Sequence, residues 1–193
     1  MDVREDIVAR IPLATRQSVP ETQQGVFDAL VQQRGDIPNA GPLAIMMHVP
    51  ELMQRGEEFR AYLRGDDSCL PRKTRELAMI LTARELDCQF IWNAHAALAR
   101  RAGIRDDTVD QLRDKKELAD LSPDETVVVN YGREFFRTHR VSQATFDAAL
   151  AQFGVRGVIE LTNLMGYYAL LAFNVNAFGV GLPTETAEAP LPI

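Results

Sequence analysis

The chain has 193 residues, of which 46% are apolar and 25% charged, and its formal net charge is −6. This is the composition of a globular protein that can bury a core within one large domain. The negative net charge argues against binding to nucleic acid or to an anionic membrane surface. The opening residues, MDVREDIVARIPL, lack a signal-peptide pattern, and no run approaches the roughly 18 apolar residues of a membrane span. We therefore expect a cytoplasmic protein.

The chain divides into three parts by composition. Residues 1–19 contain Pro12 and should form an extended arm that packs on the body or on a partner subunit. Residues 20–181 should form a single domain. Residues 182–193, with three prolines and few apolar anchors, predict a loose tail.

Apolar residues recur at helical spacing along the whole domain, and no segment shows the alternation of a strand. Pro50 should kink or divide one of these helical segments, and Asp87 marks a short break in another. The sequence thus predicts an all-α fold of about eight helices. The predicted helical segments are, in order, 20–35, 43–63, 71–103, 106–116, 122–139, 142–154 and 155–180.

One stretch, residues 75–101, concentrates the rare residue types: a cysteine, the single tryptophan and one of three histidines. Cys88, Trp92 and His95 share one stripe of a helix because they are four and three residues apart. A helical hairpin would return Glu76 over that stripe. A carboxylate, a thiol and an imidazole in an apolar surround are suited to proton transfer or thiol chemistry.

These residues resemble the carboxymuconolactone decarboxylase and alkylhydroperoxidase D (AhpD) family. Its peroxidase branch carries a glutamate, eleven residues, Cys-x-x-Cys, three residues and a histidine. Glu76, Cys88, Ile91 and His95 occupy those positions, with isoleucine in place of the second cysteine. The decarboxylase branch keeps the glutamate and the histidine and lacks the cysteines.

The resemblance implies an AhpD-like helical fold with a central helical hairpin. It also implies a homo-oligomer, either a trimer or a hexamer, with the pocket near a subunit interface. In the C-terminal helix, Tyr167 and Asn174 match the decarboxylase branch, but Asn163 stands where that branch has a histidine. This departure argues against the lactone decarboxylation reaction itself.

Each candidate residue also has a purely structural interpretation. Glu76 could offset the dipole at the start of its helix, and His95 could be a core histidine bonded to the backbone. Cys88 could be an inert buried thiol. Ile91 cannot resolve a sulfenic acid, and Cys69 could do so only if the fold brings it near Cys88.

The leading interpretation is a small-molecule enzyme in which Glu76 and His95 act as acid and base on a carbonyl, lactone or enol substrate, with Cys88 in the site. The alternatives are an AhpD-like thiol peroxidase that uses Cys88 alone and a non-catalytic ligand-binding oligomer. No ligand set for a metal stands out, and we expect no cofactor. Besides the catalytic candidates, the residues expected to line the substrate pocket are Ile91, Trp92, Asn163 and Tyr167.

Overall fold

The computed structural model describes residues 10–183 and 186–193. As predicted, this part of the chain is all-α, with eight α-helices and no β-strand. Two short 3-10 turns precede the first helix. The helices are α1 (Gln24–Arg34), α2 (Gly41–Met46), α3 (Pro50–Arg64), α4 (Arg72–Glu85), α5 (Gln89–Arg101), α6 (Asp106–Arg113), α7 (Pro123–Thr138) and α8 (Gln143–Phe178).

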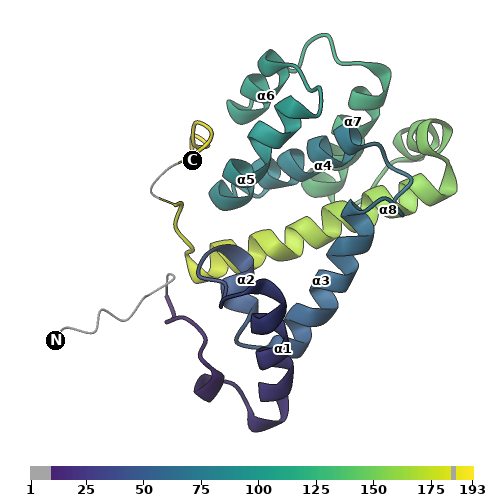
Figure 1. Cartoon of the computed structure of the whole chain (residues 1–193). Helices are drawn as coiled ribbons and strands as arrows, with labels where there is room; N and C mark the ends of the chain where they lie inside the picture. The colour runs from purple at the N-terminus through teal and green to yellow at the C-terminus, as the bar shows by residue number, and fades with distance from the viewer. Residues whose placement is uncertain (1–9, 184–185) are drawn as a thin grey trace.

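The longest helix, α8, crosses the middle of the molecule (Figure 1). Helices α4 to α7 lie on one side of it and α1 to α3 on the other. Helix α8 contacts α2, α3, α4, α5 and α7. The core therefore forms around α8, and side chains from both layers meet on it.

The predicted central hairpin is formed by α4 and α5. Pro71 precedes the first turn of α4, a position that tolerates its missing N–H. After α4 ends, Asp87 adopts a left-handed backbone conformation with φ of 49°. The backbone N–H of Cys88 then donates to Ala83 O at 2.8 Å, and α5 begins directly afterwards. This tight connection makes α4 and α5 antiparallel neighbours.

Two breaks between helical segments occur at residues where the sequence predicts them, Pro50 and Gly154. Pro50 begins α3 and separates it from α2, so the predicted segment 43–63 is two helices. Gly154 has φ of 67° and ψ of 176°, which interrupts the helical conformation inside α8. Glycine tolerates this positive φ because it has no Cβ. The segments predicted on either side of Gly154 therefore meet at a kink.

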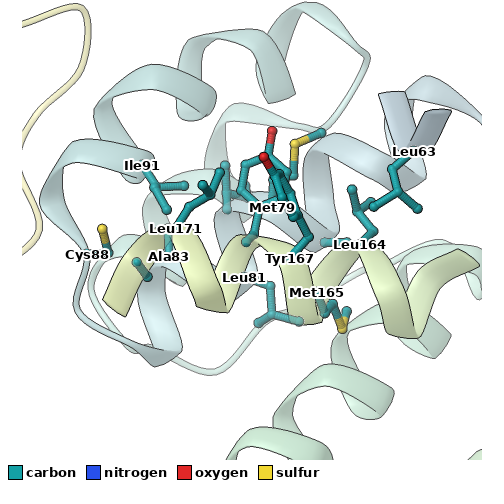
Figure 2. Packing of buried hydrophobic residues seen from close by; sticks show 14 of the residues in the cluster. Leu63, Met79, Leu81, Ala83, Cys88, Ile91, Leu164, Met165, Tyr167 and Leu171 are labelled. Carbon is teal, nitrogen blue, oxygen red and sulfur yellow. The ribbon is translucent and has the colours of Figure 1, made fainter. Parts of the chain in front are cut away.

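The core is close-packed where α7 crosses α4 and α8. A Cβ atom on Gly132 of α7 would lie 2.5 Å from a terminal methyl group of Leu81 and 2.9 Å from that of Met165, so a larger residue would require these side chains to shift. Figure 2 shows Leu81 and Met165 in the same cluster, with Cys88 beside Ala83 and Ile91 and far from Leu63. The buried cluster thus extends along α4 from the hairpin turn to α3.

Described residues near both ends of the chain contact the body. In the N-terminal arm, residues 1–9 lie outside the described part, but Arg10 N–H donates to Phe178 O at 3.1 Å. The C-terminal tail, which the sequence predicts to be loose, contacts the body within residues 186–193. Leu191 is buried, and its backbone N–H and C=O both bond to the Gln89 side chain, at 2.8 and 2.6 Å. A single apolar side chain, together with these bonds, anchors the tail on α5.

Helix α8 is the one described helix long and apolar enough to cross a membrane by length and composition. However, 56% of its most apolar window is buried inside the fold. The helix also carries the buried Glu160. These features are typical of the core helix of a soluble protein.

Glu160 fixes the loop between α3 and α4 to α8. Its carboxylate accepts hydrogen bonds from Tyr62 Oη at 3.0 Å, Ser68 Oγ at 2.7 Å and the Cys69 N–H at 2.8 Å. Arg156 Nε donates to it from one turn earlier at 2.8 Å. Burial alone would raise the pKa of Glu160, but these donors outweigh burial and lower the pKa to about 2. The ionised carboxylate is therefore a stabilising link.

This link makes a pH-dependent contribution to stability. Because the folded pKa is about 2 and the ordinary value is 4.5, the contribution is complete above pH 4.5 and is lost as the pH falls toward 2. The shift corresponds to roughly 3 kcal/mol in the free energy of unfolding. Urea denaturation of the wild type and of Glu160→Gln should show a difference near neutral pH that closes by pH 2. Glu58→Gln, at an exposed position of α3, is the control. A difference that is independent of pH would contradict this account.

Candidate active site

The hairpin brings Glu76 and His95 together in the interior. Glu76 lies in the second turn of α4, and His95 in the second turn of α5. Glu76 Oε2 is 2.9 Å from His95 Nδ1, and the two residues are only 3% and 7% exposed. A buried carboxylate and imidazole in direct hydrogen bond can share and move a proton. The expected return of Glu76 over the α5 stripe is what the structure shows.

Tyr168 of α8 completes this arrangement. Its hydroxyl lies 3.3 Å from His95 Nε2, and the two rings meet edge to face with centroids 5.1 Å apart. An ionised carboxylate can only accept, so in a neutral imidazole Nδ1 carries the proton and Nε2 accepts from Tyr168. Burial raises the pKa of Tyr168, which keeps its hydroxyl protonated as a donor. The three side chains therefore form a carboxylate–imidazole–phenol chain.

One face of Glu76 opens on a small cavity of about 140 Å³. The cavity is lined by Arg64, Arg72, Arg75 and Met79 in addition to Glu76. Arg64 Nη2 lies 4.0 Å from Glu76 Oε1, the oxygen that His95 does not occupy. A substrate can therefore approach the carboxylate beside guanidinium groups.

Cys88 lies away from the Glu76–His95 pair and does not share a reactive centre with it. It precedes the first residue of α5 and is fully buried. Burial raises the pKa of its thiol, and the N–H groups of Ile91 and Phe90 oppose this effect without reversing it. His95 lies seven residues further on, about 10 Å along the helix axis. The residue one turn before His95 is Ile91, which has no reactive group.

Cys69 is exposed and lies in the loop between α3 and α4, next to Glu160. Its thiol pKa is raised by partial burial and by the Glu160 carboxylate. Both cysteines are free thiols in this structure.

The four residues expected to line the pocket fall into two groups. Ile91 and Trp92 are buried in the core, and Trp92 Nε1–H donates to Ala189 O of the tail at 3.2 Å. Asn163 and Tyr167 line a separate cavity of about 360 Å³ between α3 and α8. The Tyr167 hydroxyl is buried there and has no hydrogen-bond partner among the described residues, and burial raises its pKa to about 12. This cavity and the one at Glu76 have no lining residue in common.

The sequence reasoning missed Tyr168 and Arg64 as parts of the site. Tyr168 falls on the buried stripe of α8 with Leu161, Leu164 and Leu171, so its hydroxyl had to find an internal partner. This helical spacing could have indicated that Tyr168 is buried and hydrogen-bonded. No sequence pattern indicates the position of Arg64, because its approach to Glu76 depends on the crossing of α3 and α4. Within residues 10–183 and 186–193, no three His, Cys, Asp or Glu side chains lie together as a metal-ligand group.

The comparisons with known proteins bear on the family and on the fold. Residues 50–134 match the model of the carboxymuconolactone decarboxylase family. The matched region runs from α3 into α7 and includes Glu76, Cys88 and His95. No curated protein sequence matches the chain.

Several solved structures share the fold. A peroxidase-related protein with an AhpD core from Ralstonia eutropha JMP134 has a TM-score of 0.68 and 17% identity, covering 92% of this chain and 93% of that one. A peroxidase-related protein from Silicibacter sp. TM1040 has a TM-score of 0.66 and 18% identity, covering 94% of both chains. The debrominase Bmp8, solved in complex with 2,3,4-tribromopyrrole, has a TM-score of 0.65 and 14% identity, covering 95% of both chains. At these identities the likeness establishes the fold alone.

The difference in burial between the two thiols predicts different reactivity. Under native conditions a thiol reagent such as dithionitrobenzoate should label Cys69 and leave Cys88 unmodified, because a buried neutral thiol is a poor nucleophile. In denaturant both should react. Cys69→Ser should abolish the native signal, and Cys88→Ser should leave it unchanged. Rapid native labelling of Cys88, followed by mass spectrometry, would contradict the burial described here.

Proposed function

We propose that the chain, whose residues 50–134 match the carboxymuconolactone decarboxylase family model, is a small-molecule enzyme that transfers protons on a carbonyl, lactone or enol substrate. The observation that carries the proposal is the buried Glu76–His95 hydrogen bond beside an open cavity. The net negative charge and the helical fold suit a cytoplasmic enzyme without nucleic-acid or membrane partners.

Each member of the carboxylate–imidazole–phenol chain has a distinct role in this proposal. Glu76 Oε2 is held by His95, so Oε1 is free to take a proton from the carbon next to the substrate carbonyl. This leaves an enolate, and the same carboxyl group returns the proton to the substrate at another position. His95 orients the carboxylate, and Tyr168 fixes the tautomer of the imidazole. Positioning of this kind is most effective in a desolvated site.

The thiol peroxidase alternative depends on Cys88. A peroxidatic thiolate would have to meet a hydroperoxide and be regenerated by a second thiol. Cys88 is fully buried, and burial raises its thiol pKa, so both requirements disfavour it. The exposed Cys69 belongs to another loop, bonded to Glu160. The geometry therefore favours proton transfer over thiol redox chemistry.

The test is the exchange of substrate hydrogens with solvent. A panel of small carbonyl and lactone compounds in deuterated buffer, followed by NMR, would reveal catalysed exchange or isomerisation. Glu76→Gln preserves the shape of the side chain and should lower the rate by about 10²- to 10⁴-fold, since an amide is not a base. His95→Asn should have a comparable effect. Cys88→Ser and the exposed Glu58→Gln should retain the wild-type rate. Full activity in both Glu76→Gln and His95→Asn would exclude acid–base catalysis at this pair.

The protein also exposes an apolar face that suits the predicted homo-oligomer, a trimer or a hexamer. Val155 and Phe173 of α8 are 67% and 62% exposed. Such contiguous exposed apolar surface usually marks a contact between chains. The 360 Å³ cavity lined by Asn163 and Tyr167 opens on the same face. The other exposed apolar residues of this face are Leu52, Phe59, Tyr62, Ile159 and Leu170.

A charged residue in this apolar face should weaken the association of the subunits. Phe173→Asp would put a carboxylate into the apolar contact, where it would be desolvated and unpaired. Light scattering after size exclusion should show the variant shifted toward monomer. Ile193→Asp, at an exposed position of the tail, should leave the mass unchanged. A monomeric wild type would contradict the proposed oligomer.

A further inference from the structure

The first turn of α4 has an unusual charge distribution. Arg72, Lys73 and Arg75 lie in this turn, no acidic residue accompanies them, and no side chain caps the helix. The N-terminus of a helix already carries a partial positive charge, so cations there are unfavourable and anions favourable. An opposite charge supplied from elsewhere would offset this cost.

Within residues 10–183 and 186–193, a carboxylate lies within ion-pair distance of only one of the three, Lys73. Lys73 Nζ lies 3.0 Å from Glu125 and 3.9 Å from Asp124 of α7. Arg75 Nη1 donates at 2.6 Å to the neutral carbonyl of Gly65. Among the residues that the structure describes, Arg72 has no carboxylate partner.

Arg64 faces these two arginines across the 140 Å³ cavity. It ends α3, where a cation is favourable, and its nearest carboxylate is Glu76 at 4.0 Å. Glu76 is also hydrogen-bonded to His95. Glu76 is therefore the single carboxylate among the residues that line this cavity, against three arginines. Arg100 offers a contrast, because it pairs with three carboxylates, those of Asp106, Asp110 and Glu188.

We propose that this cavity binds a small anionic group, a carboxylate or phosphate, between Arg64, Arg72 and Arg75. We further propose that this group belongs to the substrate on which Glu76 acts, a step that rests on the proposed function. Guanidinium groups recognise carboxylate and phosphate through paired N–H donors. The volume equals the share of roughly four or five water molecules at ~30 Å³ each. It therefore admits the anionic group and a few attached atoms.

The arrangement also explains how the substrate would be oriented. With its anionic group held at the start of α4, the attached carbon atoms extend toward Glu76, which lies one turn along the same helix from Arg72. Only Oε1 is available there, because Oε2 bonds to His95. The arginines would thus place a carbon–hydrogen bond against the one free carboxylate oxygen.

The test measures binding without turnover. Malonate and inorganic phosphate, each titrated into the full-length protein by calorimetry, should bind, and added potassium chloride should weaken the binding. The neutral analogue malonamide should not bind. Arg72→Gln removes an exposed guanidinium that makes no internal ion pair, so the fold should be unaffected. It should weaken malonate binding about ten- to hundredfold, as for the loss of one charged hydrogen bond. Arg64→Gln should have a similar effect, and the exposed Arg140→Gln should have none.

The outcomes separate this inference from the proposed function. Wild-type protein that binds neither anion, or equal affinity in Arg72→Gln and Arg140→Gln, would overturn the anion site and leave the exchange test of Glu76 standing. Anion binding that follows the expected order, together with full turnover by Glu76→Gln, would support the anion site and exclude the proposed chemistry.

Discussion

The hydrogen bond between Glu76 and His95 is the constraint that organises the centre of this molecule. Two polar side chains in a nearly dry interior must satisfy each other, because an unpaired buried polar group costs about 1–3 kcal/mol. Their pairing fixes how α4 and α5 are rotated relative to each other. The remaining imidazole nitrogen also needs a partner, which Tyr168 provides from α8. One interaction thus sets the relative positions of the hairpin and the central helix.

The same interaction determines what the carboxylate can do. Glu76 has two oxygens, one held by His95 and one beside the arginine-lined cavity. The first keeps the group in place, and the second remains available for chemistry. Glu160 offers the contrast, because four donors use both of its oxygens and it has a purely structural role. Both carboxylates are buried, and they differ in that Glu76 has an oxygen beside a cavity, which supports the acid–base role proposed for it.

The sequence was informative where the determinants are local. Helical spacing, Pro50 and Gly154 predicted the helices and their breaks, since these depend on backbone preferences over a few residues. The hairpin was predictable because the motif fixes the separation of Glu76 and His95. Long-range packing was not predictable in this way. The tail reads as polar and proline-rich, yet Leu191 and two backbone bonds to Gln89 fix it on α5, more than ninety residues away in sequence. Tyr168 and the arginine-lined cavity likewise depend on how separate helices cross.

The structure explains the consequence of having Ile91 in place of the second motif cysteine. The position one turn from the imidazole is the one where a thiol could exchange a proton with His95, and here it is apolar. The remaining cysteine, Cys88, receives backbone N–H groups at the start of α5, a setting that favours a thiolate, but burial has the larger effect on its pKa. The docked tail bonds to Gln89, the next residue, and to Trp92. Exposing Cys88 would mean opening this part of the core, whereas Glu76 already borders a cavity. The architecture therefore favours the carboxylate over the thiol as the reactive group.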